Sequence, residues 1–181
     1  MGQHILDLFQ YCPKCGKRTF KPVNDKAKRC LDCGYTYYIN PSAAVAVFIR
    51  NPEGNALLVA TRAKEPAKGT YDLPGGFTDL NETVEEAVVR EVFEETNLHV
   101  SKLNYLFSIP NSYEYSGLIV PTMDLFFEVE VDNLTDLTAA DDVAECEFID
   151  LDKLDPVKFG LKSVSEAVSR YIKEHLNELS R

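Results

Sequence analysis

The chain contains 181 residues, of which 45% are hydrophobic and 27% charged, so it can form one substantial core and a small additional module. Its net charge of −10 argues against a protein that binds nucleic acid through a generally basic surface. The longest apolar runs, such as Ala43–Ile49, are far shorter than the roughly 20 residues of a membrane helix. The N-terminus also lacks the pattern of a secretory signal, so we expect a cytoplasmic protein without a membrane partner.

Residues 1–40 are turn-rich and basic, with seven Lys or Arg and three Asp. The remaining residues carry twelve basic and twenty-six acidic side chains. We predict two domains, a small one at 1–40 and a larger one at 41–181. An acidic body can accept an anionic substrate when divalent cations lie between the two, so this distribution gives a first hint of metal chemistry.

Two Cys-x-x-Cys-Gly motifs lie in the first segment, at Cys12-Pro-Lys-Cys15-Gly and Cys30-Leu-Asp-Cys33-Gly. In each motif two thiolates can bind one tetrahedral Zn²⁺, and the glycine allows a left-handed turn that directs backbone N–H groups at sulfur. The spacing predicts a zinc ribbon. Four cysteine ligands leave no open coordination position, so we expect the zinc to be structural. Cys146 has no partner in the sequence and is interpreted as a small buried hydrophobic residue.

The purpose of the ribbon has two interpretations. It is either a scaffold for the rest of the protein or its dimer, or a nucleic-acid contact made by its basic side chains. Those side chains are Lys14, Lys17, Arg18, Lys21, Lys26, Lys28 and Arg29. The overall acidity and the short length of the segment favour the scaffold.

Several strands are expected in the larger domain. The segment Ser42–Arg62 contains two β-rich runs around the turn Asn51–Asn55, which reads as a hairpin. A polar loop at 64–72 leads to the sharp turn Leu73-Pro-Gly75-Gly76. The segments Leu103–Ser108, Thr122–Val131 and Glu145–Leu151 are predicted strands. Strands interleaved with two helices indicate an α/β fold with a mixed sheet between helices.

A glutamate-rich helix is predicted at Thr83–Thr96, where Glu91, Glu94 and Glu95 stand at i, i+3 and i+4 and share one face. Three carboxylates this close repel one another, and their oxygens suit Mg²⁺ or Mn²⁺ better than zinc. Val84, Val88 and Val92 form an apolar stripe on the opposite side. The alternative interpretation is an ordinary solvated acidic helix.

The wider pattern around this helix decides between the two. Gly76, Glu82, Arg90-Glu91, Glu94-Glu95 and Leu98 stand at the spacings of the Nudix signature, so residues 76–98 resemble that family. Asn97 replaces the glycine expected after the two glutamates, but asparagine also adopts the left-handed turn that ends a helix. Asn81 and Asp79 are further mild departures.

This resemblance implies a Nudix-type α/β/α sandwich that hydrolyses the pyrophosphate bond of a nucleoside diphosphate linked to another group. It implies metal ligands at Glu91, Glu95 and the Gly75 carbonyl, with Glu94 as a further ligand or the base that deprotonates water. Arg90 is expected to orient the glutamates, while Gly76 and Glu82 support the site. Asp142 stands where a distant metal-binding glutamate is expected, and Asp141 and Glu145 are alternatives.

A zinc ribbon ahead of the signature resembles the NADH pyrophosphatase subfamily. Those enzymes carry the pattern S-Q-P-W-P-F-P-x-S where this chain has Ser108–Ser116, and Ser108, Pro110 and Ser116 match. The resemblance places NADH or NAD⁺ first among substrates, then ADP-ribose or a nucleotide sugar, then FAD. Phe77 is the expected stacking aromatic. We also consider tyrosines as stacking walls, at Tyr71, Tyr113 and Tyr115.

An amphipathic helix is predicted at the end of the chain. Its apolar side chains recur at three- and four-residue steps, at Leu161, Val164, Val168, Tyr171, Ile172, Leu176 and Leu179. They are interpreted as packing on the domain's own sheet, with a homodimer contact as the alternative. A rival function is a nucleotide-sensing regulator that binds nucleic acid through the ribbon. The complete set of box carboxylates and the absence of a predicted helical DNA-binding domain favour the hydrolase.

Overall fold

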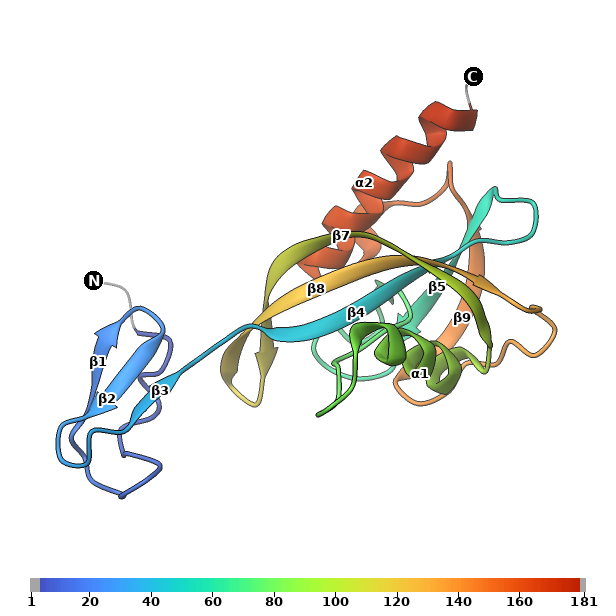
Figure 1. Cartoon of the computed structure of the whole chain (residues 1–181). Coiled ribbons are helices and arrows are strands. Elements are labelled where there is room, and N and C mark those ends of the chain that lie inside the picture. Colours follow the sequence, from blue (N-terminus) through green and yellow to red (C-terminus); the bar gives the residue numbers. More distant parts are fainter. Residues whose placement is uncertain (1–3, 180–181) are drawn as a thin grey trace. The chain divides into compact units, whose positions relative to one another are not determined.

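A computed structural model describes residues 4–179, with side chains through residue 175. The chain divides into two compact units, Met1–Pro41 and Ser42–Arg181, next to the predicted division after residue 40 (Figure 1). Each unit has its own secondary structure and its own buried cluster. Among the described residues, none of the helices has the length and apolar character needed to cross a membrane.

The N-terminal unit is a three-stranded antiparallel sheet of β1 (Phe20–Asn24), β2 (Ala27–Cys30) and β3 (Thr36–Tyr38). Its buried hydrophobic cluster contains only Cys12, Phe20 and Cys30, with Tyr35 packed against it. A cluster this small buries too little apolar surface to order the segment by itself. The four cysteines are therefore the main source of order available to this unit.

Within residues 42–179, the larger unit contains six strands in two sheets. They are β4 (Ser42–Ile49), β5 (Ala56–Arg62), β6 (Tyr71–Asp72), β7 (Val100–Tyr115), β8 (Leu118–Val131) and β9 (Val143–Asp150). One sheet has the order β4-β8-β7 and is mixed, because β4 pairs with β8 in parallel and β7 pairs with β8 antiparallel. The other has the order β6-β5-β9 and is antiparallel. The predicted mixed sheet is confirmed.

The predicted hairpin of the first two strands of this unit is wrong. The turn after β4 exists, since the Asn51 side chain accepts hydrogen bonds from the N–H groups of Asn55 and Ala56. Beyond the single bridge between Arg50 and Leu57, however, β4 and β5 belong to different sheets. The run Val45–Ile49 is buried on both faces, which is typical of a strand that is covered on both sides and has a parallel neighbour. Its continuous hydrophobicity, more than the turn beside it, accounts for its place next to β8.

The glutamate-rich helix α1 (Val84–Thr96) begins and ends at capping residues. The Thr83 hydroxyl accepts from the Glu86 N–H at 3.2 Å, and the Glu86 carboxylate accepts from the Thr83 N–H at 2.8 Å. This reciprocal pair satisfies two backbone donors that the helix start would otherwise leave free. At the other end Asn97 adopts the left-handed conformation, with φ 59°. The asparagine thus ends the helix as expected.

The two helices lie on opposite faces of the strands, as Figure 1 shows for the larger unit. Alternate residues of β4 point to opposite sides, because side chains alternate along a strand. Val45 and Val47 belong to one buried cluster with Val88 of α1, while Phe48 belongs to the other with Tyr171 of α2 (Lys162–Leu179). This arrangement confirms the predicted α/β/α sandwich.

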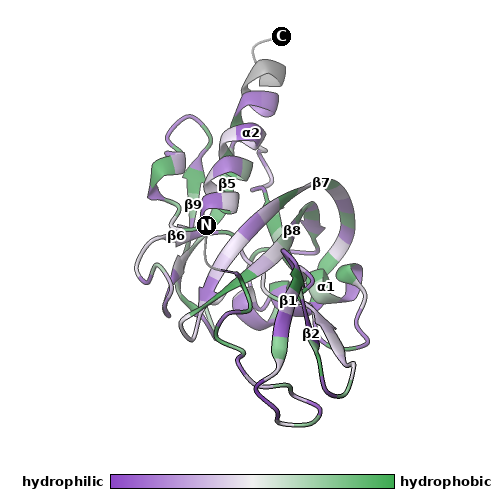
Figure 2. Ribbon diagram, turned by 90° about the vertical axis from the view of Figure 1, so that its left-hand side faces the viewer, coloured by the Kyte–Doolittle hydropathy of each residue, from purple (hydrophilic) through white to green (hydrophobic). Residues whose placement is uncertain are grey.

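The C-terminal helix α2 follows a short 3₁₀ turn, η1 (Pro156–Lys158), and packs on the sheet of its own unit. Its ribbon changes repeatedly between hydrophilic and hydrophobic colours in Figure 2, in keeping with the predicted amphipathic pattern. Val164, Val168 and Tyr171 are buried. Leu161 and Ile172 pack against the same cluster, and the side chains of Leu176 and Leu179 lie outside the described residues.

A hydrogen-bonded contact fixes this helix on the sheet. The Tyr171 ring stacks on Phe48 with centroids 4.0 Å apart, and its hydroxyl donates to the Glu128 carboxylate at 2.5 Å. Glu128 also forms an ion pair with Arg50 at 2.9 Å. The contact joins α2 to two neighbouring strands, β4 and β8.

Candidate active site and zinc centre

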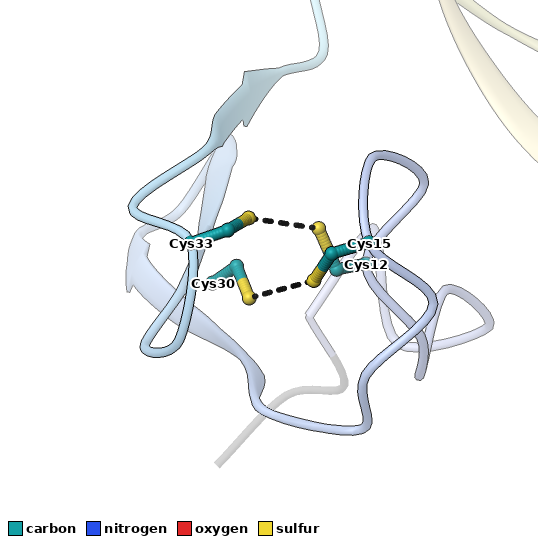
Figure 3. A group of neighbouring side chains, drawn as sticks. All are labelled: Cys12, Cys15, Cys30 and Cys33. Carbon is teal, nitrogen blue, oxygen red and sulfur yellow. Dashed lines mark hydrogen bonds between the residues drawn. The ribbon is translucent and has the colours of Figure 1, made fainter.

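The four ribbon cysteines converge in space, as Figure 3 shows. Their sulfur atoms all lie within 4.8 Å of one another, with Cys12 Sγ 3.7 Å from Cys33 Sγ and Cys15 Sγ 3.6 Å from Cys30 Sγ. Four sulfurs at these separations can surround one tetrahedral zinc ion. Within the part of the chain that the structure describes, no other group of three or more Cys, His, Asp or Glu converges in this way.

The loops that carry these cysteines repeat the same geometry. Gly16 and Gly34 have φ values of 73° and 74°, in the left-handed region that glycine adopts without strain. The Gly16 N–H donates to the Cys12 carbonyl at 2.8 Å, and the Gly34 N–H donates to the Cys30 carbonyl at 3.0 Å. Each turn therefore folds back and presents its pair of thiols on the same side.

In the larger unit, α1 directs its carboxylates into a cavity of about 260 Å³. Glu95 is only 7% exposed, and one of its carboxylate oxygens accepts from the Gly75 N–H at 2.8 Å. Burial raises the pKa of Glu95 to about 9 and also raises the pKa of Glu91. The charged form of both groups is costly in this environment unless a cation lies nearby.

Arg90 connects the carboxylates around the cavity. Its Nε and Nη2 donate to the two Glu82 oxygens at 2.8 and 2.9 Å, which is a bidentate pair. Its Nη1 donates to Glu91 at 2.8 Å and to Glu94 at 3.0 Å, and Nη2 also reaches the Phe77 carbonyl at 3.0 Å. The guanidinium also lowers the pKa of Glu82 to about 2. Arg90 thus holds Glu82, which lies just before α1, close to Glu91 and Glu94 of the helix.

The glycine turn before α1 lies alongside β4. The Val45 N–H donates to the Gly76 carbonyl at 2.8 Å, and the Val47 N–H donates to the Pro74 carbonyl at 2.9 Å. The intervening Gly75 carbonyl receives no hydrogen bond from the described residues, so it remains available as a ligand. A side chain at Gly75 would place its Cβ 2.1 Å from the Val45 carbonyl oxygen. Only glycine therefore allows this close approach of the two backbones.

Gly76 makes room for a carboxylate. A Cβ at this position would lie 2.5 Å from one Glu91 oxygen and 2.7 Å from its carboxyl carbon. The Glu91 carboxylate thus occupies the space that a side chain at position 76 would fill. The two neighbouring glycines therefore allow different contacts. Gly75 lets the turn approach the backbone of β4, and Gly76 leaves space for the Glu91 carboxylate.

The other expected residues are divided between the cavity and the surface. Phe77 and Tyr113 line the cavity, with their rings at 90° and their centroids 5.4 Å apart. Asp141 and Asp142 also line it, and both form ion pairs with Lys64.

Three residues considered from the sequence do not line this cavity. Tyr71 packs edge-on against Phe159 and donates to Glu147, and Tyr115 is 63% exposed beyond the end of the cavity wall. Glu145, an alternative to Asp142, lies on β9 outside the lining. Only Phe77 and Tyr113 among the expected aromatics are therefore placed to face a ligand here.

The cavity has a second, polar end that the sequence reasoning missed. Its side chains come from four strands and are Arg62, Asp72, Asn111, Thr122 and Asp124. The signal was present in part, because Thr122 and Asp124 alternate with apolar residues in a strand that otherwise reads as buried. Their convergence with residues of other strands depends on sheet pairing, which the local pattern does not reveal.

Comparisons with known proteins agree with this geometry. Residues 40–170 match the NUDIX domain family, and residues 7–38 match the NADH pyrophosphatase zinc ribbon domain. The chain belongs to the Nudix family. A Nudix hydrolase from Nitrosomonas europaea has a similar fold, with a TM-score of 0.67, 21% sequence identity and 93% of each chain covered.

Two curated Nudix relatives differ in how much of the chain they match. The NAD-capped RNA hydrolase NudC of Haemophilus influenzae is 37% identical over 64% of this chain and 44% of its own length. An ADP-ribose pyrophosphatase of Methanocaldococcus jannaschii is 36% identical over 76% of this chain and 78% of its own. The chain thus spans less than half the length of the first relative but most of the second.

Proposed function

We propose that this Nudix protein hydrolyses the pyrophosphate bond of a nucleoside diphosphate linked to a second group, with Mg²⁺ or Mn²⁺ as cofactor. The observation that carries the proposal is the pair of carboxylates formed by buried Glu95 and partly buried Glu91, in one cavity with Arg90 and the Gly75–Gly76 turn. An ordinary acidic helix exposes its glutamates to water. Here burial raises the pKa of both acids, and a bound cation would stabilise their charged form.

The donor set fits a hard divalent ion. Glu91, Glu95 and the Gly75 carbonyl offer oxygen ligands, and Asp142 faces the same cavity. When bound, the metal neutralises charge on the pyrophosphate oxygens and lowers the pKa of a coordinated water. Glu94 is half exposed at the cavity wall, with a side chain 47% accessible, and is our candidate for the group that accepts the proton of the attacking water. Arg90 holds Glu91 and Glu94 in place during this transfer.

We propose ADP-ribose and NAD(H) as the two leading substrate candidates. The match to an ADP-ribose pyrophosphatase over most of both chains supports the first. The NADH pyrophosphatase zinc ribbon and the NAD-capped RNA hydrolase relative support the second. Phe77 and Tyr113 supply an aromatic corner on which a planar base can pack.

The test is turnover by the full chain with Mg²⁺ or Mn²⁺ on a panel of ADP-ribose, NADH, NAD⁺, a UDP-sugar, FAD and a dinucleoside polyphosphate. Glu95→Gln removes one charge from the centre of the site with little change of shape. We expect it to lower kcat by at least about a hundredfold. Glu85→Gln is the matched control, since this residue lies in the first turn of α1 and is exposed. Equal turnover by wild type and Glu95→Gln would contradict the assignment.

A further inference from the structure

The polar end of the cavity is built by one face of the β7–β8 hairpin. Residues directly opposite each other in an antiparallel pair share a face. The opposed pairs Ile109–Asp124, Asn111–Thr122 and Tyr113–Val120 occupy alternate positions and therefore share one face of the sheet. Asn111, Tyr113, Thr122 and Asp124 of this set line the cavity. The residues between them, such as Ser112, point to the other face and are exposed.

Asp124 is the centre of this polar end. It is only 8% exposed, and its carboxylate accepts hydrogen bonds from three different elements. Asn111 Nδ2 donates at 3.0 Å, the Thr122 hydroxyl at 2.6 Å and the Ser163 hydroxyl of α2 at 2.5 Å. No cationic side chain among the described residues forms an ion pair with it. Asp124 is therefore a buried acid whose hydrogen-bond donors are all neutral side chains.

The nearby cation is already engaged elsewhere. Arg62 forms a buried ion pair with Asp72, and its Nε donates to the Pro66 carbonyl at 2.8 Å. Arg62 also faces the Tyr113 hydroxyl. These contacts place a neutral ion pair and a phenol beside Asp124. The surroundings are therefore rich in hydrogen-bonding groups.

Unused hydrogen-bonding capacity remains on this surface. Asn111 donates through Nδ2 to Asp124, while its Oδ1 receives no hydrogen bond from the described residues. A carboxylate has about four acceptor positions, and Asp124 uses three of them. A ligand group that both donates and accepts hydrogen bonds would satisfy Asn111 and Asp124 together. Sugar hydroxyls have this property, whereas an aromatic ring has not.

We propose that Asn111 and Asp124 form a subsite for the hydroxyls of a sugar ring attached beyond the pyrophosphate, as in ADP-ribose. This inference rests on the proposed function and names the group that this end of the cavity would bind. Where the NADH pyrophosphatase pattern has Trp, this chain has Asn111. Asn111 places an amide at a position that faces the cavity. It favours a hydroxyl-bearing group over a planar one at this end.

The test compares ADP-ribose with the β-methyl ester of ADP, which keeps the nucleoside and the pyrophosphate bond but lacks the terminal sugar. AMP release is measured for both substrates with the full chain and Mg²⁺. Asn111→Ala is expected to raise KM for ADP-ribose about tenfold and to change KM for the methyl ester less than about twofold. Ser112→Ala, on the outward face of the same strand, is the matched control and is expected to change neither value.

Asp124 also ties the first turn of α2 to the sheet through Ser163, so its replacement can affect folding. Asp124→Asn, which keeps the size of the side chain, is therefore the second variant, with its melting temperature recorded beside its kinetics. A rise in KM confined to ADP-ribose in either folded variant supports the subsite. An equal change for both substrates, or none, would overturn it. Failure of the wild type to cleave these two substrates and every substrate of the panel above would instead refute the proposed function.

Discussion

The adjacent glycines of the active-site turn predict opposite outcomes for the same substitution. In Gly75→Ala the new Cβ would lie 2.1 Å from the Val45 carbonyl oxygen and 2.8 Å from the Ala46 Cα. Both are backbone atoms of a buried strand and have little freedom to move. The backbone at Gly75 also has φ 148°, which L-residues rarely adopt. We expect a loss of about 3–5 kcal/mol in the free energy of unfolding, and a melting temperature lower by about 6–20 °C.

In Gly76→Ala the new Cβ meets a side chain. It would lie 2.5 Å from one Glu91 oxygen, whereas ordinary contact begins at 3.4 Å, so the carboxylate must move by roughly 0.9 Å. The backbone at Gly76 is outside the left-handed region, and alanine fits it. We expect the melting temperature to stay within about 3 °C of the wild type. A displacement of this size in a group that we propose to bind the metal is expected to lower kcat about a hundredfold.

The assay is thermal unfolding followed by circular dichroism, together with Mg²⁺-dependent AMP release from ADP-ribose. The expected pattern is an unstable Gly75→Ala variant and a stable but nearly inactive Gly76→Ala variant. Full activity in Gly76→Ala would refute the idea that this glycine makes room for a functional Glu91. An unchanged melting temperature in Gly75→Ala would refute the close backbone approach.

Tyr171→Phe removes the hydroxyl that donates to Glu128, and we expect it to lower stability by about 1–2 kcal/mol and the melting temperature by about 2–8 °C. Tyr115→Phe, at an exposed position, is the control, and equal melting of the two variants would show that the Tyr171 contact is unimportant. Cys33→Ser leaves three sulfurs around the zinc centre, so zinc content measured by elemental mass spectrometry should fall well below that of the wild type. Cys146→Ser should retain the metal, and undiminished zinc in Cys33→Ser would rule out the four-cysteine site.

The local elements were predictable because their signals are short in range. The range of α1 follows from the cap at Thr83, the left-handed turn at Asn97 and the apolar stripe between them, all of which act within a few residues. The ribbon turns are equally local, since each depends on two cysteines and one glycine. The same reasoning failed for the segment Ser42–Arg62, where a good turn suggested a hairpin. Strand pairing depends on which distant segment buries the strand, and a turn signal carries no information about that.

In the candidate site, too, the local features were predictable from the sequence and the long-range ones were not. The spacing of Gly76, Glu91 and Glu95 predicts the chemistry, because a helix of regular pitch places the two glutamates on one face, where we propose that a divalent cation balances their charge. The shape of the cavity was decided by tertiary structure alone. Asn111 and Asp124 meet because β7 and β8 pair in one particular register. Register and sheet order are set by burial over the whole domain, so the surroundings of the second substrate group arise only when the chain is folded.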